Sequence, residues 1–368
     1  MNACRFCPMC YPVDAVALKT KRMSCSPRGR SLILSLLEQG KLEWNMDVAD
    51  ILYKFSPDGL CREWCVGKYD LDQLIMDSRH QLIQKEIIPE EVSKVISNVT
   101  KYGNPFGDEP GSLKKILAEA GSIPSSNPNL LLFLGCTARI KTPTLIKYFI
   151  QLLNRVNIPF AIMDEEICCG GILYELGDYK KAKEQASILK ATFSKKNTNN
   201  VCVLDPECYR MFLTRYPRWN INLDKGTQIF NAGEYIWSLL ESKYIKVNRL
   251  ISEKVVYHDP FQFARYAVDF ESARKILNKL CATKIEEMRF NKSLAHCCGS
   301  AGGLFFTNPD IALEMAKDII EEAMETGASL LVTNSPFCQF LLQKAKEDYL
   351  VKDIQIKHII ELTLESIQ

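Results

Sequence analysis

The chain has 368 residues, and its 46 Lys and Arg residues nearly balance its 44 Asp and Glu residues, giving a formal net charge of +2. This balance gives no electrostatic reason to expect nucleic acid or an acidic membrane surface as the main partner. Hydrophobic residues make up 47% and charged residues 24%, which argues against disorder, and the length favours two or three domains. We expect a cytoplasmic protein, because no apolar stretch approaches the about 18 residues of a membrane span and MNACRFCPMC lacks the pattern of a secretory signal.

Cysteine is the unusual component of this composition, with 15 residues. The odd count, the tight clustering and the missing export signal argue against a disulfide framework. Closely spaced thiols in a reducing compartment are more often metal ligands. The sequence therefore predicts metal binding and leaves the kind of metal open.

The first 85 residues form a candidate domain with helical patterns. Residues 31–40 predict a short helix that ends at Gly40, and residues 71–85 place apolar side chains along one stripe at helical spacing. Residues 86–129 are predicted to be a linker, because Pro and Gly interrupt residues 101–112 and 121–129. The cysteines of the first part are Cys4, Cys7, Cys10, Cys25, Cys61 and Cys65.

Beyond Leu130, short apolar runs typical of buried parallel strands alternate with helical patterns. The runs in the first lobe, residues 130–250, lie at 129–136, 159–171 and 200–208, with helices expected at 143–158 and 179–195. The second lobe, residues 251–368, repeats the order, with strands at 254–261 and 328–338 and helices at 271–281 and 308–327. We predict an α/β fold with two tandem βαβ-type lobes, whose ligands lie at the carboxyl ends of parallel strands.

The two lobes also repeat their cysteines in register. Cys168 and Cys297, each the first of a vicinal pair, are 129 positions apart, and Cys208 and Cys338 are 130 apart. This pattern resembles the CCG cysteine-rich domain, in which a cysteine, a Cys-Cys-Gly element and a Cys-x-x-Cys element follow one another. That domain occurs, usually twice per chain, in heterodisulfide reductase subunits and in the iron–sulfur subunits of glycolate oxidase and anaerobic glycerol-3-phosphate dehydrogenase.

Three positions depart from the family pattern. Asp205 replaces the first cysteine of the last element in the first lobe, whereas Phe261 and Ser335 replace two cysteines in the second. The family's noncubane clusters, which cleave a disulfide, use all five thiolates of a copy, so the resemblance disfavours disulfide reduction. It implies four thiolates for zinc or an iron–sulfur cluster in the first lobe, namely Cys136, Cys168, Cys169 and Cys208. For the second lobe it implies a cubane with one open iron or no metal at all, on Cys297, Cys298 and Cys338.

The amino-terminal part resembles a two-cluster ferredoxin domain with one half degenerate. In such domains three ligands come from one motif and the fourth from the other. The resemblance implies one 4Fe–4S cluster on Cys4, Cys7, Cys10 and Cys65. The second set reads Phe55, Asp58, Cys61 and Asp14, so we expect the neighbouring cluster to be lost. A zinc knuckle of the first three cysteines with Cys25 is the alternative.

Other candidate chemistry is sparse. His258 and His296 lie beside ligand positions of the second lobe, so a supporting or substitute ligand role stays open. Residues 164–166 read as a solvated acidic turn rather than an acid/base site. No phosphate-cradling Gly-Lys-Ser/Thr loop and no GxGxxG motif occur, so the chain is expected to bind no flavin or nicotinamide itself.

The resemblance implies an iron–sulfur electron-transfer subunit of an oxidoreductase, with no catalytic residue assigned. It would relay single electrons between a flavoprotein, of the FAD dehydrogenase or electron-transfer flavoprotein type, and a quinone, carrier protein or disulfide. Such a subunit would work in a hetero-oligomer, at the membrane only through its partners. The alternative is a non-catalytic scaffold that docks redox chains, with zinc in the first lobe and an empty second lobe.

Overall fold

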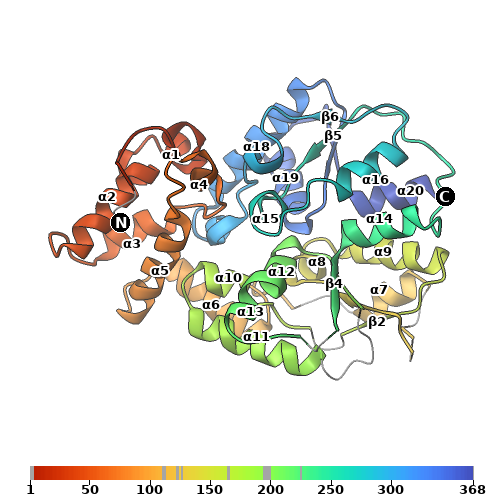
Figure 1. The fold of residues 1–368 in the computed structure, drawn as a ribbon, viewed down its shortest axis with the longest axis horizontal. Coiled ribbons are helices and arrows are strands. Elements are labelled where there is room, and N and C mark those ends of the chain that lie inside the picture. Colours follow the sequence, from red (N-terminus) through yellow and green to blue (C-terminus); the bar gives the residue numbers. More distant parts are fainter. Residues whose placement is uncertain are drawn as a thin grey trace.

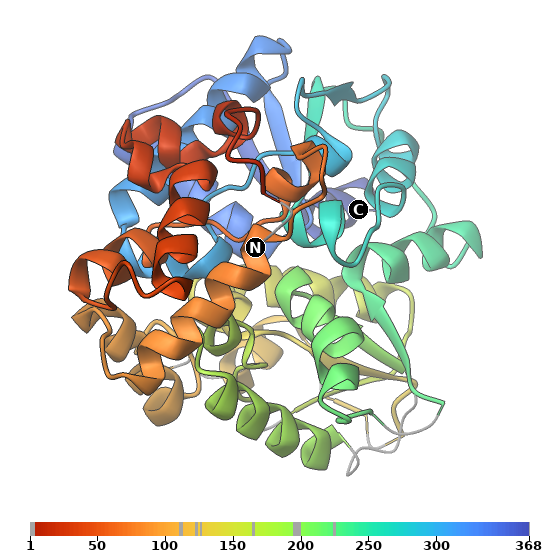
Figure 2. The ribbon, with the colours of Figure 1, turned by 60° about the vertical axis from the view of Figure 1, so that its left-hand side comes forward.

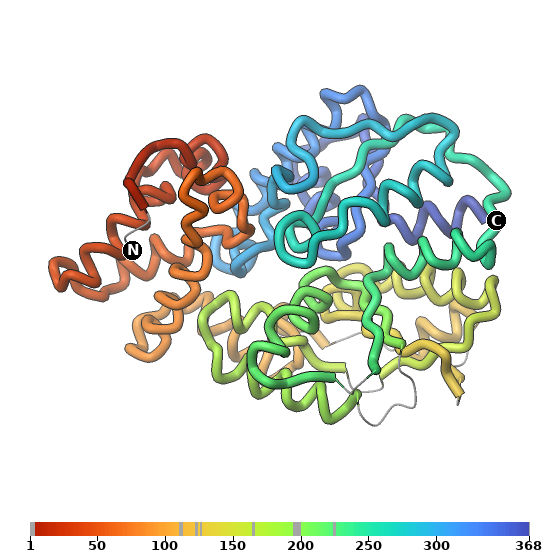
Figure 3. Tube along the Cα trace, in the orientation of Figure 1, coloured from red at the N-terminus to blue at the C-terminus, as the bar shows by residue number. Residues whose placement is uncertain are grey.

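The computed structural model describes residues 4–109, 113–121, 124–125, 127–163, 166–193, 200–223 and 226–367. A helical amino-terminal part stands beside two α/β lobes (Figure 1). The chain passes from these helices into the first lobe and then into the second, as the change from orange through green to blue shows (Figure 3). The predicted α/β class with two parallel sheets is therefore confirmed.

The amino-terminal part is entirely helical within the described residues. Ser26 and Asn45 begin two of its helices, because their side-chain oxygens accept backbone N–H groups of the first turn. The segment 86–129, expected to be a linker, contains two further helices, the first of which buries one apolar face. The elements are η1 (Tyr11–Val13), α1 (Ala15–Thr20), η2 (Met23–Cys25), α2 (Pro27–Glu38), α3 (Met46–Tyr53), α4 (Leu60–Trp64), α5 (Leu71–Gln84), α6 (Glu90–Tyr102) and α7 (Leu113–Glu119).

The first lobe is a four-stranded parallel sheet in the order β2-β1-β3-β4. Its central strands are buried along their length, as expected for a sheet with helices on both faces. The strands are β1 (Leu130–Phe133), β2 (Phe160–Ile162), β3 (Asn200–Val203) and β4 (Gln228–Asn231). The helices are α8 (Cys136–Ile140), α9 (Pro143–Arg155), α10 (Gly171–Glu175), α11 (Tyr179–Phe193), α12 (Pro206–Arg210), η3 (Met211–Arg215), α13 (Tyr216–Arg218) and α14 (Ala232–Glu241).

The second lobe repeats this arrangement with the parallel order β6-β5-β7-β8. The strand expected at 328–338 ends earlier, because Ser335 caps a helix that begins at Pro336 and carries Cys338 in its first turn. The strands are β5 (Val255–His258), β6 (Glu286–Glu287), β7 (Leu330–Thr333) and β8 (Gln355–His358). The helices are α15 (Phe261–Arg265), α16 (Ser272–Leu280), η4 (Lys292–Leu294), η5 (Ala301–Gly303), α17 (Leu304–Thr307), α18 (Pro309–Glu325), α19 (Pro336–Asp348) and α20 (Ile359–Ser366).

The parts share hydrophobic cores. One core combines α3 and α5 with the first sheet, and a second joins both lobes through α9, α14, α16 and α20. Figure 2 shows the amino-terminal helices against the edge where the two lobes meet. Along the described part of the chain, no helix combines the length and apolar character that crossing a membrane requires.

Candidate metal centres

The amino-terminal cysteines gather around the end of α4. Cys10 lies close enough to Cys7 and Cys65 for their charges to raise the pKa of its thiol, although burial is the larger cause and the value reaches about 11. Cys4 lies near Tyr69, and its sulfur accepts the Phe6 N–H at 3.4 Å. Cys7 is exposed and the other three cysteines are half-buried. Cys7, Cys10 and Cys65 thus form a group near the surface, and such a group suits an iron–sulfur cluster.

The second set of positions, which keeps only one cysteine, lies beside the first. Other side chains occupy this place. The Asp14 carboxylate accepts a hydrogen bond from Arg30 Nη1 at 2.8 Å, and Cys61 Sγ lies 4.0 Å from the same carboxylate oxygen. The Arg30 guanidinium also lies 4.6 Å from the centre of the Phe55 ring. Both charged side chains are buried. A buried ion pair and an aromatic ring thus occupy this position, which leaves a single thiol there.

Four thiols of the first lobe lie beyond the carboxyl ends of its strands, in loops or in the first turns of the helices that follow. Cys136 begins α8, Cys168 and Cys169 precede α10, and Cys208 lies in α12. Hydrogen bonds link Cys136 with Cys168 and Cys169 with Cys208, which spreads the sulfurs along an arc. The hydrogen bond from Cys168 and burial raise the pKa of the Cys136 thiol well above its ordinary value. Metal binding here must therefore release thiol protons.

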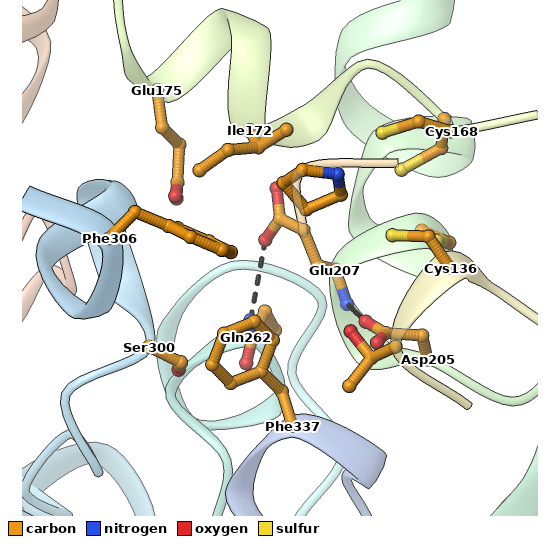
Figure 4. A pocket seen from close by; sticks show the side chains of 14 residues that line it. Cys136, Cys168, Ile172, Glu175, Asp205, Glu207, Gln262, Ser300, Phe306 and Phe337 are labelled. Carbon is orange, nitrogen blue, oxygen red and sulfur yellow. Dashed lines mark hydrogen bonds between the residues drawn. The ribbon is translucent and has the colours of Figure 1, made fainter. Parts of the chain in front are cut away.

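This arc lines a cavity of about 50 Å³ between the two lobes (Figure 4). Ile172 and Glu207 of the first lobe face Gln262 and Phe306 of the second across it, and Gln262 donates to Glu207 at 3.3 Å. Glu175 also lines the cavity, and Arg210 pairs with Glu175 at 2.9 Å and with Glu207 at 2.5 Å. Other lining residues are Pro105, Thr137, Asp205, Ser300 and Phe337.

Two carboxylates beside the arc have structural partners. Asp205, which replaces a family cysteine, caps α12 by accepting the Glu207 N–H at 2.8 Å, and burial raises its pKa to about 6. Glu166 accepts the N–H groups of Leu134 and Gly135 at 2.8 and 2.7 Å, directly before Cys136. The expected solvated turn is therefore wrong at Glu166, which is buried and shapes the thiol loop; residues 164 and 165 lie outside the described residues.

The second lobe arranges its donors differently. Cys298 Sγ lies 2.9 Å from Cys338 Sγ, whereas the neighbouring Cys297 packs in a small core with Val16 and Phe261, next to the amino-terminal helices. Ser335, at a family cysteine position, caps α19 by accepting the Cys338 N–H at 3.2 Å. Phe261 fills the position of the leading cysteine with a buried ring.

The remaining residues of interest have ordinary surroundings. Cys25, Cys202 and Cys281 are buried and free, and the last two lie in the hydrophobic core shared by the lobes. The His80 ring is hydrogen-bonded to the Gly177 carbonyl oxygen at 2.8 Å. His296 stacks on Phe290, with ring centres 4.1 Å apart.

Comparison with known proteins gives the same duplicated pattern. The family model described as a cysteine-rich domain, CCG, matches residues 130–213 and 255–343. A relative from Methanosarcina barkeri, named as one subunit of a dihydromethanophenazine:CoB–CoM heterodisulfide reductase, is 27% identical over 84% of this chain and 76% of its own length. Another relative, named as one subunit of a fumarate reductase (CoM/CoB) from Methanothermobacter marburgensis, is 22% identical over 86% of this chain and 61% of its own length.

A solved structure shares the fold. The crystal structure of a hypothetical protein from Helicobacter pylori superimposes with a TM-score of 0.65 over 93% of this chain and 68% of its own, at 12% identity. That likeness concerns the fold alone. Spacing, sheet topology and the family match agree on both lobes, and the chain therefore carries the CCG cysteine-rich domain twice, at residues 130–213 and 255–343.

Proposed function

We propose that this chain is the iron–sulfur electron-transfer subunit of an oxidoreductase complex. The observation that carries the proposal is the grouping of Cys10 with Cys7 and Cys65, because it joins thiols more than 50 positions apart at a half-exposed place. Three ligands from one motif and a fourth from the other is how a cubane is held in ferredoxin-like domains. This set would accept and release one electron at a time.

The first lobe supplies a second centre. The thiols of its arc are all buried at the cavity except Cys136, which is half-buried. These four described cysteines form a wide set, since no three of their sulfurs all lie within 4.8 Å of one another. A wide set suits a cluster in which each thiolate binds a different iron, and it fits a single zinc ion less well. We assign this lobe an iron–sulfur cluster.

The names of the relatives support a role for these centres within a complex of several subunits. Their names describe subunits of a heterodisulfide reductase and a fumarate reductase, which supports a hetero-oligomer here too. The partner we propose is a flavoprotein of the FAD dehydrogenase or electron-transfer flavoprotein type, with a quinone, a carrier protein or a disulfide as acceptor. The lack of a Gly-rich dinucleotide fingerprint supports a flavin held by another chain.

The test is anaerobic purification of the full chain, followed by iron analysis and electron paramagnetic resonance of the reduced protein. We expect more than one cluster's iron and a reduced cubane spectrum. Cys65→Ala removes that spectrum, whereas Cys25→Ala, at a buried cysteine outside the proposed set, keeps it. An iron-free chain after reconstitution, or an unchanged spectrum in Cys65→Ala, contradicts the proposal.

A further inference from the structure

The second lobe carries a compact set of donor atoms that the iron–sulfur proposal does not use. The ligand atoms of His258, Cys298 and Cys338 all lie within 4.8 Å of one another. In the part of the chain that the structure describes, no other group of three histidine, cysteine or acidic residues is so compact. Each of the three residues is only 1% exposed. Two thiols and an imidazole, sealed from water, are a typical donor set for zinc.

The imidazole of His258 forms no hydrogen bond within the part of the chain that the structure describes. Both ring nitrogens, Nδ1 and Nε2, are fully buried there without a partner. A buried polar group without a partner costs about 1–3 kcal/mol, so such a group in a folded protein calls for an explanation. An imidazole nitrogen without a hydrogen-bond partner is free to bind a metal ion instead.

The position of the two sulfurs also favours a single metal ion. Their separation of 2.9 Å exceeds the about 2.05 Å of a disulfide bond. Around a tetrahedral zinc ion with Zn–S bonds of about 2.3 Å, ligand atoms lie about 3.6–3.8 Å apart, so small shifts of these side chains suffice. A cubane would need wider spacing, since each thiolate binds a different iron. The helix cap at Ser335 fixes Cys338 in the first turn of α19.

The two lobes differ in the residues paired at the ends of their central strands. His258 on β5 lies beside Thr333 on β7, at the ends of the strands. The corresponding pair in the first lobe is Phe133 on β1 and Val203 on β3, which are apolar. Thus the first lobe has Phe133 followed by the thiol of Cys136, and the second has His258 followed by the ring of Phe261. An imidazole stands where the second lobe lacks its leading thiol.

We propose that the second lobe binds one Zn²⁺ ion through His258 and the thiolates of Cys298 and Cys338. Cys297 lies outside this compact set, and its thiol, hydrogen-bonded to Cys298, would have to shift to become the fourth ligand of a His-Cys₃ set. On binding, the thiols release their protons and the imidazole bonds through a free ring nitrogen. Zinc has no redox chemistry, so this ion fastens the Cys-Cys-Gly loop and α19 to the end of β5 and carries no electrons.

The test measures zinc in the full chain, purified anaerobically and freed of loosely bound metal. We expect one zinc ion per chain and an X-ray absorption spectrum with sulfur at about 2.3 Å and imidazole nitrogen at about 2.0–2.1 Å. His258→Phe, which introduces the residue of the first lobe, and Cys338→Ala each lower bound zinc at least tenfold. Cys208→Ala, the matching thiol of the first lobe, and Cys281→Ala, a buried thiol elsewhere, keep it.

Several outcomes overturn the proposal: zinc retained in both site variants, zinc lost in Cys208→Ala instead, or iron in place of zinc at the site. A Cys298–Cys338 disulfide in the denatured, alkylated protein also overturns it. If the variants fail to fold, the absorption spectrum of the unaltered chain decides, because an all-sulfur shell excludes His258. The inference does not rest on the proposed electron relay. Zinc can be present at this site in a chain without iron, and iron can be present in a chain without this zinc.

Discussion

Arg30 Nη1 lies 2.8 Å from Asp14 Oδ2 at a place where a ferredoxin-like domain would hold its second cluster. Asp14 and Phe55, which Arg30 also contacts, both occupy positions that the resemblance assigns to cluster cysteines. The guanidinium therefore neutralises the acidic replacement and covers the aromatic one. An ion pair and an aromatic contact between protein side chains thus hold this part of the amino-terminal helices together.

Breaking this pair is expected to be costly. Arg30→Met leaves the buried Asp14 carboxylate without its counter-charge, which costs about 3–5 kcal/mol of unfolding free energy. Adding Asp14→Asn, which keeps the oxygen that caps α1, recovers part of that loss. The measurement is urea denaturation followed by far-ultraviolet circular dichroism. The control is Asp50→Asn, which removes a partly exposed pair with Lys54 and costs less than about 1 kcal/mol. Equal losses in Arg30→Met and the control would refute this account.

Asp72 is expected to make stability depend on pH. Burial, and then the nearby Asp58 carboxylate, raise its pKa from 3.8 to about 7. The folded protein binds this proton more tightly than the unfolded chain does. The contribution of this protonation to the unfolding free energy is therefore complete below about pH 4 and is lost as the pH rises to 7.

Asp72→Asn therefore gains stability relative to the unaltered protein between pH 4 and pH 8, by up to about 4 kcal/mol. Thermal unfolding at a series of pH values measures this. Asp47→Asn, at an exposed carboxylate on α3, should follow the unaltered protein. Parallel pH profiles for all three proteins would contradict the assignment.

Gly302 is expected to tolerate no side chain. Its φ is +68°, and an added Cβ would lie 2.3 Å from Pro57 Cδ and 2.8 Å from the Phe55 oxygen, at the contact between the amino-terminal helices and the second lobe. Gly40 has a similar φ of +67°, and a Cβ added there would have no atom of the described residues within 4 Å. Gly40→Ala thus measures the backbone cost alone, about 1–2 kcal/mol. Gly302→Ala should lower the melting temperature further and speed proteolysis between the parts; equal melting temperatures would disprove the tight contact.

Glu166 is expected to control metal loading of the first lobe. Glu166→Ala leaves the N–H groups of Leu134 and Gly135 without their acceptor, at about 1–3 kcal/mol for each buried group, and loosens the loop that carries Cys136. Glu166→Gln keeps one acceptor. We expect the iron content per chain to be lower in Glu166→Gln than in the unaltered protein, and lower still in Glu166→Ala. The electron paramagnetic resonance spectrum of the amino-terminal cluster should stay the same in both variants. Full iron content in Glu166→Ala would show that the carboxylate does not shape the site.

The sequence was most informative where packing is local. The runs at 130–133 and 330–333 are apolar at every position but Thr333, and both form buried central strands. The edge strands β4 and β8 were missed, because Gln228 and Gln355 begin short, partly exposed segments without an apolar run. The helix at Cys338 could have been predicted, since Ser335 followed by proline is a typical helix start.

The sites depended on contacts that sequence patterns do not contain. The pairing of Glu166 with two amides 31 and 32 positions away needs the parallel register of the strands. Spacing suggested Cys297 as a ligand of the second lobe, yet the compact set is formed by the two other cysteines with His258. Only the three-dimensional arrangement distinguishes the two members of a vicinal pair.

Arg79 is fully buried in the amino-terminal part and has backbone carbonyl oxygens as its hydrogen-bond acceptors. Those acceptors come from all three parts of the chain: Leu52, Tyr53, Phe55, Glu175 and Gly302. The Arg79 guanidinium keeps all of its hydrogen bonds only while each of these backbone segments stays in place. The three parts therefore depend on one another for this shared anchor, and displacing any one of them would leave part of the Arg79 guanidinium buried without acceptors.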